Sequence, residues 1–172
     1  MMKYALFDYV PRRFQQISFE LQDVRRMILG FKDGRNVYTR WAAKEFARAL
    51  SAMDLTNTVV VCVPASTMCA HVRRWKLFSK LLCRQTGAID GFSHVQVCGN
   101  RKRAHITGEC ELCNNIKHLL NIDAEFFRGK NVLVIDDIYT SGRSSEAFIE
   151  ALKNAGAEVR MAMFLAKTRV FR

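Results

Sequence analysis

Two short apolar segments constrain the fold of this chain most strongly. Residues 58–63 and 131–135 are apolar at almost every position, a pattern typical of strands that are buried on both faces. Segments with the apolar spacing of amphipathic helices lie between and around them. Strands that alternate with helices in this way predict an α/β domain, in which helices flank a mainly parallel central sheet.

The remaining elements follow from periodicity and from turn residues. Helices are predicted at 19–31, 38–53, 69–86, 112–120 and 145–155, and further strands near 94–98 and 159–166. No repeat, low-complexity tract or flexible linker separates these segments. We therefore expect a single domain over residues 1–172, with N-terminal helices in residues 1–55 and a core in residues 56–172.

The charge of the chain is strongly positive and unevenly distributed. The formal net charge is +11, and eight basic residues lie between Arg73 and Arg103 against the single acid Asp90. They are Arg73, Arg74, Lys76, Lys80, Arg84, Arg101, Lys102 and Arg103. Such a field attracts phosphate, either on a small substrate or on a nucleic acid backbone. A solvated basic surface that only maintains solubility is the alternative.

Membrane and secretory roles do not fit the sequence. The longest apolar runs have the length of strands, far below the ~20 residues of a membrane-spanning helix. Asp8 interrupts the N-terminal segment too early for a secretory signal. We therefore expect a cytoplasmic protein without a membrane partner, in which the six cysteines are buried thiols rather than disulfides.

Residues 132–144 carry the chemistry that is easiest to interpret. Two acids, Asp136 and Asp137, follow an apolar strand, and a turn rich in hydroxyl groups then leads into a helix. Backbone N–H groups at the start of a helix bind phosphate, and Gly142 permits a close approach. Carboxylates accept hydrogen bonds from sugar hydroxyls and can bind Mg²⁺. The segment predicts a ribose 5-phosphate site, although two acids at a strand end and a helix capped by Ser144 are the plainer interpretation.

This segment resembles the motif with which type I phosphoribosyltransferases bind 5-phosphoribosyl-1-pyrophosphate (PRPP). The resemblance implies that Asp136 and Asp137 contact the ribose 2′- and 3′-hydroxyls, directly or through Mg²⁺. It also implies that the turn holds the 5-phosphate. The residues of the implied PRPP site are Asp136, Asp137, Ile138, Tyr139, Thr140, Ser141, Gly142, Arg143 and Ser144. Tyr139 can also lean over a nucleobase or remain an exposed turn residue. The family fold implies a small hood, which we assign to the N-terminal segment.

Two further segments fit the same resemblance less specifically. Pro64, Ala65, Ser66 and Thr67 stand where the family's pyrophosphate loop is expected, although they also suit a simple connection. Arg101, Lys102, Arg103 and His105 lie where a mobile loop closes over PRPP in this fold. Lys102 or Arg103 is the candidate that stabilises the leaving pyrophosphate, with ordinary exposed basic residues as the alternative.

The order of features is similar to the ComF-like branch of these proteins. Residues 31–34 precede an amphipathic helix, Val63-Pro64 ends a strand, and a basic helix contains residues 74–78. Two departures are the absence of an N-terminal cysteine-rich zinc module and the replacement of the branch's usual Arg-Gly-Phe-Asn run. This branch is associated with DNA uptake, so the resemblance adds DNA as a candidate partner for residues 73–103.

Two functions of different classes therefore remain open. The first is Mg²⁺-dependent transfer of the phosphoribosyl group from PRPP to a nitrogen nucleophile, a nucleobase or ammonia, with release of pyrophosphate. The second is a non-catalytic protein of the same fold that binds DNA or acts in its uptake or regulation. A domain that only binds PRPP and serves as a partner surface is a third version. Dimers are common in this fold, and the sequence leaves the oligomeric state open.

A zinc site is a separate question. His105, Cys110, Cys113 and His118 offer four ligands that can bind Zn²⁺ tetrahedrally. Their spacing matches no common zinc module, and Cys113 also suits a buried position on the predicted helix at 112–120. Both interpretations stay open.

Overall fold

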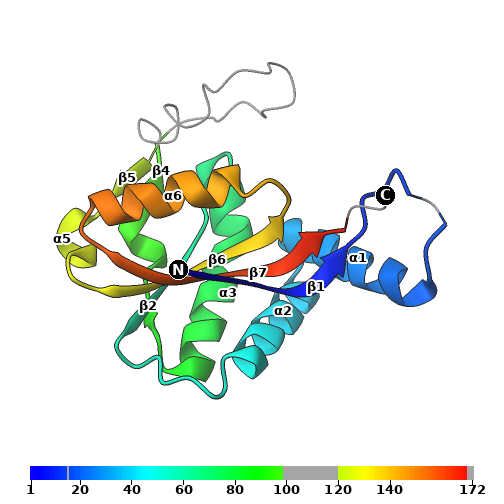
Figure 1. The fold of residues 1–172 in the computed structure, drawn as a ribbon, viewed down its shortest axis with the longest axis horizontal. Helices are drawn as coiled ribbons and strands as arrows, with labels where there is room; N and C mark the ends of the chain where they lie inside the picture. Colours follow the sequence, from blue (N-terminus) through cyan, green and yellow to red (C-terminus); the bar gives the residue numbers. More distant parts are fainter. Residues whose placement is uncertain (15, 99–119, 170–172) are drawn as a thin grey trace.

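The computed structural model describes residues 1–14, 16–98 and 120–169. Its centre is a five-stranded sheet in the order β1-β7-β6-β2-β3, and all four strand pairings are parallel (Figure 1). The strands are β1 (Met2–Tyr9), β2 (Thr58–Cys62), β3 (Ile89–Asp90), β6 (Asn131–Tyr139) and β7 (Glu158–Thr168). The predicted mainly parallel sheet is therefore confirmed.

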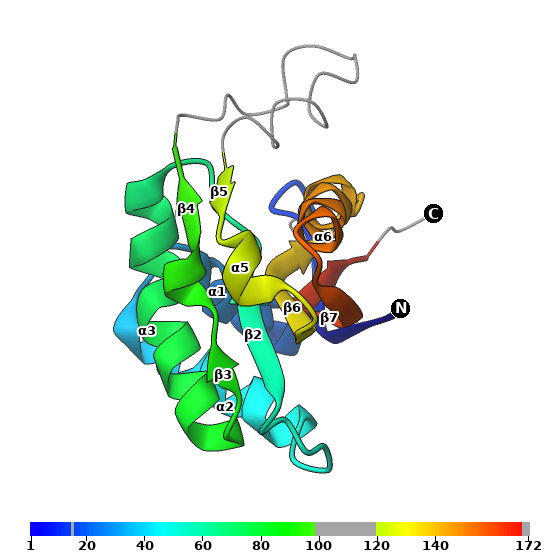
Figure 2. The same ribbon diagram turned by 90° about the vertical axis from the view of Figure 1, so that its left-hand side faces the viewer.

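Helices cover both faces of this sheet. One face carries α1 (Phe19–Lys32), α2 (Asn36–Ala49) and α3 (Met68–Thr86), and α6 (Arg143–Asn154) lies on the other (Figure 2). The short helix α5 (Ala124–Phe127) and the 3₁₀ turn η1 (Phe92–His94) flank a second, antiparallel sheet of two strands. These strands are β4 (Val95–Val97) and β5 (Leu120–Ile122).

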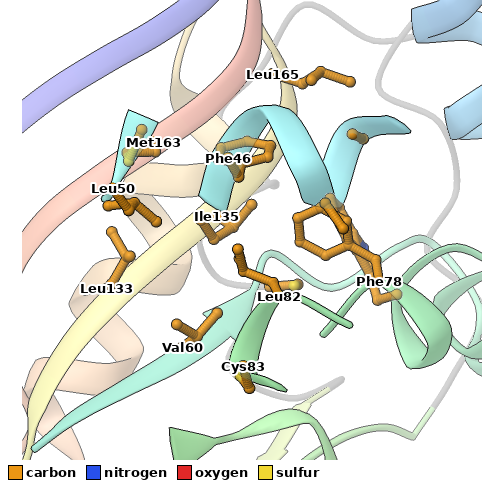
Figure 3. Close-up of a cluster of buried hydrophobic side chains, with 14 of the residues drawn as sticks. Phe46, Leu50, Val60, Phe78, Leu82, Cys83, Leu133, Ile135, Met163 and Leu165 are labelled. Carbon is orange, nitrogen blue, oxygen red and sulfur yellow. The ribbon is translucent and has the colours of Figure 1, made fainter. Parts of the chain in front are cut away.

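Alternation along the central strands divides the core into two clusters. Leu133 and Ile135 of β6 pack toward the side of α1, α2 and α3, where Phe46, Phe78 and Leu82 are buried (Figure 3). Residues between them on the strand, such as Val134, pack toward α6 and join Phe148, Ile149 and Leu152. Strands buried on both faces explain why these segments are continuous apolar runs rather than alternating ones.

Local sequence signals account for the helix boundaries. Thr67 caps α3 because its hydroxyl oxygen accepts a hydrogen bond from Ala70 N at 3.1 Å. Ser18 caps α1 in the same way through Leu21 N. Gly87 ends α3 in the left-handed conformation, with φ 74°. Helix α2 ends at Ala49, before the predicted end at 53, because Leu50 turns into the core as its C-cap.

Several further elements differ from the predictions. Strand β1 was not predicted: only helices were expected in residues 1–55, the first of them at residue 19, but Met2–Tyr9 forms a strand that pairs with β7 at the sheet edge. An edge strand is exposed and needs no continuous apolar run, so Lys3 and Asp8 are tolerated in it. Strand β6 continues to Tyr139, past the predicted end at 135, because β7 keeps pairing with it. Leu120 starts β5 instead of ending a helix, and residues 112–119 lie outside the described residues.

The parallel topology places the ends of β2 and β6 beside each other. Cys62 pairs with Ile135, and Val63 N donates a hydrogen bond to Ile135 O at 2.8 Å. The segments that follow these two strands therefore meet at one edge of the sheet, where ligands bind in open α/β folds. Among the described residues, no helix combines the length and apolar character needed to span a bilayer.

Candidate functional site

The turn between β6 and α6 lies at this edge and is held in one conformation (Figure 1). Gly142, the N-cap residue of α6, has φ 77°, and a Cβ atom there would lie 2.8 Å from the Tyr139 ring. Ser145 Oγ donates to Gly142 O at 2.9 Å, and the hydroxyls of Thr140 and Thr168 hydrogen-bond each other at 2.9 Å. The first N–H groups of a helix have no partner within it, so this end of α6 presents donors to an anion.

The Tyr139 ring packs between the turn and strand β7. Its ring meets the Phe164 ring edge to face, with centroids 4.8 Å apart, and Lys3 Nζ lies 5.5 Å from the ring centroid. Lys3 also forms an ion pair with Glu146 in the first turn of α6, at 2.7 Å. The ring thus packs against β7 and beneath Gly142. The sequence left open whether Tyr139 is an exposed turn residue, and in the structure its ring is partly buried.

The two acids lie on β6 itself rather than in the turn, and each bonds to the backbone that follows it. Asp136 Oδ1 accepts from Asp137 N at 2.8 Å, and Asp137 Oδ1 accepts from Ile138 N at 2.7 Å. These contacts fix both carboxyl groups close to the strand. Because neighbouring side chains on a strand point to opposite faces, the two acids have different surroundings.

Asp137 faces the side of α1 and α3 and is bound there by the chain's own cations. Arg74 Nη1 donates to Asp137 Oδ2 at 2.7 Å, and Lys32 Nζ lies 3.9 Å from the same oxygen. The Asp137 side chain is 8% exposed and that of Arg74 15%. A buried carboxylate of this kind needs its counter-ion, because burying an unpaired charge is costly.

Asp136 is half-buried and has only one hydrogen bond among the described residues, the one to Asp137 N. Loss of hydration and the neighbouring charge of Asp137 raise the pKa of Asp136 to about 8, although Arg74 and Lys32 oppose this shift. Its carboxyl group therefore carries a proton at neutral pH until a ligand or a cation favours the ionised form. The two acids are not equivalent.

A cavity of about 570 Å³ brings these parts together. Its walls come from the ends of β2 and β6, from the turn and from the facing helices α1 and α3. The lining residues are Lys32, Val63, Pro64, Ala65, Ser66, Arg74, Asp136, Asp137, Ile138, Tyr139, Thr140, Ser141, Gly142, Arg143, Ser144 and Ser145. The predicted sugar-phosphate turn and three of the four predicted pyrophosphate-loop residues thus line one cavity. The fourth, Thr67, uses its hydroxyl to cap α3.

The sequence did not single out two cavity residues, Lys32 and Arg74. Lys32 falls in residues 31–34, to which the sequence assigns no site role, and Arg74 is one of eight basic residues between Arg73 and Arg103. Helical phase holds a weak signal: Arg74 flanks the buried stripe of His71, Trp75 and Phe78, whereas Arg73 lies opposite that stripe and is exposed. Arg101, Lys102, Arg103, His105, Cys110, Cys113 and His118 all lie outside the described residues.

Similarity to known proteins agrees with this geometry. Residues 90–169 match the phosphoribosyl transferase domain. The match includes β6, both acids, the turn and α6. It supports the type I phosphoribosyltransferase family but does not extend to the ComF-like branch.

One curated relative and two solved structures resemble this chain over part of its length. An orotate phosphoribosyltransferase of Staphylococcus haemolyticus (strain JCSC1435) is 30% identical over 89 residues, 47% of this chain and 44% of that protein. The chain thus spans less than half of this relative's length. UMP synthase of Leishmania donovani aligns with a TM-score of 0.46 at 18% identity, over 84% of this chain and 24% of that one. A purine phosphoribosyltransferase from Pyrococcus horikoshii Ot3 aligns with a TM-score of 0.34 at 14% identity, over 94% and 86%.

Proposed function

We propose that this protein binds PRPP with Mg²⁺ and transfers its phosphoribosyl group to a nitrogen nucleophile, releasing pyrophosphate. The observation that carries the proposal is the shared cavity: a helix N-terminus, an acid pair and the loop after β2 all line it. A sugar that carries a phosphate at one end and a diphosphate at the other needs these three kinds of group together. The match to the phosphoribosyl transferase domain supports the same reaction class.

In this proposal each part of the cavity has one task. The turn at residues 140–144 receives the 5-phosphate through its N–H groups and hydroxyls. Asp136 and Asp137 accept hydrogen bonds from the ribose hydroxyls. Residues 64–66, the part of the predicted loop that lines the cavity, contact the diphosphate, which leaves C1′ with the bonding electron pair as the nitrogen forms the new bond. Lys102 and Arg103 remain the candidates that neutralise the leaving diphosphate.

The acid pair also fits Mg²⁺. Mg²⁺ is usually held by one or two carboxylates together with substrate phosphates rather than by a protein cage. Bound there, the ion would neutralise charge that develops on the diphosphate. Asp136, with one of its carboxylate oxygens free of a hydrogen bond among the described residues, is the first candidate ligand.

The acceptor in the proposal is a nucleobase or ammonia. The orotate phosphoribosyltransferase relative favours a pyrimidine-type acceptor, and the purine phosphoribosyltransferase keeps a purine in the panel. We also propose the cytoplasm as the site of action and leave a homodimer as an expectation. The ComF-like branch remains a proposal that rests on the order of sequence features.

Titration calorimetry with PRPP and Mg²⁺ tests the binding half of the proposal. We expect the parent chain to bind PRPP and Asp136→Asn to bind it at least about ten-fold more weakly, because a hydrogen bond to a charged group contributes ~1.5–3 kcal/mol. Glu150→Gln, an exposed acid on α6 that does not line the cavity, is the matched control. A parent chain without measurable PRPP affinity would reject the proposal.

Pyrophosphate release tests the catalytic half. The protein is incubated with PRPP, Mg²⁺ and each member of a panel of purines, pyrimidines and ammonia. Release that depends on one acceptor identifies the enzyme and its substrate. Tight PRPP binding without release from any acceptor would instead identify a PRPP-binding protein that lacks transferase activity.

Nucleic acid binding is the second candidate function, favoured by one surface of α3. Arg73, Lys76, Lys80 and Arg84 are all exposed, and their spacing puts them on one stripe of the helix. Such a stripe can follow a phosphate backbone. Binding of single- or double-stranded DNA that weakens with salt, and weakens further in Lys80→Glu/Arg84→Glu, would support this function. Salt-independent or absent binding would reject it.

A further inference from the structure

The wall of the cavity that α1 and α3 provide contains two cations. Lys32 is the last residue of α1, and Arg74 lies in the second turn of α3. Both line the cavity across the sheet edge from the turn that begins α6. Neither belongs to the sugar-phosphate turn or to the loop after β2.

Arg74 is held in a defined orientation by three contacts. Its Nη1 donates to Asp137 Oδ2 at 2.7 Å, and its Nε donates to Lys32 O at 3.0 Å. Its guanidinium carbon lies 5.8 Å from the Trp75 ring centroid. Nη2 has no hydrogen-bond partner within the described part of the chain. A planar guanidinium fixed on two sides keeps its remaining N–H groups preorganised for an oxyanion.

Lys32 is brought to Arg74 by a tight contact between helices. Gly34, just after α1, has φ 72°, and a Cβ there would lie 2.6 Å from Arg73 O on α3. The end of α1 is therefore packed directly on α3. The Lys32 side chain is 44% exposed and lines the cavity, and its Nζ lies 3.9 Å from Asp137 Oδ2.

The charges of this wall do not cancel. Lys32 and Arg74 carry two positive charges, and the carboxylate that touches them, Asp137, carries one negative charge. The other oxygen of Asp137, Oδ1, accepts a hydrogen bond from Ile138 N, so both oxygens of this carboxylate already have partners within the protein. One positive charge remains in a partly desolvated cavity, where attraction for an anion is stronger than in bulk water.

We propose that Lys32 and Arg74 form a second oxyanion subsite in this cavity, separate from the turn at residues 140–144 and positioned by Asp137. The ligand chemistry is an oxyanion with two or more oxygens. Its source is either the diphosphate of the sugar ligand or a carboxylate on the acceptor. The assignment rests on the proposed function in that it assumes a phosphorylated sugar in the turn.

Binding of three small ligands to variant proteins tests this subsite. The ligands are inorganic pyrophosphate with Mg²⁺, orotate as a heterocyclic carboxylate, and ribose 5-phosphate. Lys32→Met keeps the aliphatic chain and removes the charge, and Lys76→Met is the control, since Lys76 is exposed on α3 and does not line the cavity. Arg74→Lys is the second test variant because it preserves a counter-ion for Asp137.

We expect the parent to bind pyrophosphate or orotate, and whichever binds identifies the source of the oxyanion. Lys32→Met should weaken that ligand about five-fold, the scale of one partly exposed charge contact, and should leave ribose 5-phosphate unchanged. Arg74→Lys should weaken the same ligand, and Lys76→Met should weaken none.

Three results would overturn the assignment. The first is that the parent binds neither pyrophosphate nor orotate. The second is that Lys32→Met and Arg74→Lys both bind them as the parent does. The third is that the two variants weaken ribose 5-phosphate binding as much as binding of the other ligand. This result would indicate a general electrostatic attraction rather than a subsite. If the parent does not bind ribose 5-phosphate, this result counts against the proposed function alone. The titrations with pyrophosphate and orotate still report on Lys32 and Arg74.

Discussion

Asp136 and Asp137 are adjacent in the chain, yet their surroundings differ. The Asp137 carboxylate is paired with Arg74 and Lys32. Burial and the charge of Asp137 raise the pKa of Asp136 to about 8. The sequence motif treats the two positions alike, because the asymmetry arises only from the helices that pack on one face of the strand.

A ligand that requires ionised Asp136 should therefore bind with release of a proton. Below about pH 8 the free protein carries the proton, so affinity for PRPP with Mg²⁺ should rise with pH and level off above that pH. The charged groups near enough to influence this carboxyl are Asp137 on β6, Arg74 on α3 and Lys32 on α1. Calorimetry in buffers of different ionisation enthalpy measures the released proton. A pH-independent affinity in the parent, or the same pH dependence in Asp136→Asn, would contradict this assignment.

His71 is a buried polar residue that the site does not use. Neither ring nitrogen has a hydrogen-bond partner in the described structure, and the ring stacks on Phe92 with centroids 5.1 Å apart. Burial and the nearby charge of Arg74 lower the pKa of His71 to about 4. The fold therefore holds the neutral ring. As the pH falls from about 6.5 toward 4, the unfolded chain takes up a proton at His71 and the folded chain does not. The free energy of unfolding therefore decreases over this range.

Replacing this histidine by an apolar residue should stabilise the protein. His71→Leu removes two unsatisfied polar atoms, and we expect a gain of about 1 kcal/mol at pH 7.5 and a larger one at pH 5. Thermal or urea unfolding at both pH values measures the difference. A loss of stability at both would show that the ring has a partner, such as a bound water molecule.

At the scale of elements, the β6–α6 turn depends on backbone geometry that only glycine adopts easily. Gly142 has φ 77° and touches the Tyr139 ring, whereas Gly129 has φ 69° with nothing within 4 Å of its added Cβ. The second glycine therefore reports the cost of the backbone conformation alone. Substitution of Gly142 reports that cost together with displacement of the Tyr139 ring that packs against the turn.

Gly142→Ala should thus lose both stability and ribose 5-phosphate binding, and Gly129→Ala should lose stability only. We expect about 1 to 3 kcal/mol from the left-handed conformation in each case, with a further loss in Gly142→Ala from contact with Tyr139. Chemical denaturation and ligand titration on both variants separate the two effects. Unchanged ribose 5-phosphate binding in Gly142→Ala would show that the turn does not receive the phosphate.

The elements that sequence predicts well here are those set by local signals. The apolar run before Asp136, the glycine in the turn and the amphipathic α6 lie within about two dozen residues of one another, so strand, turn and helix could be predicted together. The roles of Arg74 and Lys32 could not, because Arg74 lies 63 positions from its partner Asp137 and Lys32 lies farther still. Such contacts depend on how helices pack, which periodicity alone does not specify.

At the scale of the whole molecule, the N-terminal strand completes the sheet next to its last strand. Strand β1 covers the edge of β7, whose residues from Met161 to Ala166 are all buried. This pairing could not be predicted from sequence, because β1 mixes charged and apolar residues as an exposed edge allows. The predicted division at residue 55 between hood and core stays a prediction, although residues 2–9 contribute a strand to the central sheet.

Removal of residues 1–10 should therefore expose a long apolar edge and cause aggregation. Light scattering after size-exclusion chromatography measures this outcome. Met2→Thr/Tyr4→Thr is the control, because it reduces the exposed apolar surface but keeps the backbone pairing with β7. A truncated chain that stays monodisperse and fully folded would mean that β1 is dispensable for the sheet.

The hydroxyl contact between Thr140 and Thr168 links the turn between β6 and α6 to the last residue of β7. The loop is thereby restrained before any ligand arrives, and part of the entropic cost of ordering it falls on folding rather than on capture. Thr168→Val removes this hydrogen bond and leaves every proposed phosphate-contacting group in place. This substitution should nevertheless slow binding of the sugar phosphate, since a less ordered turn must adopt the binding conformation each time a ligand arrives.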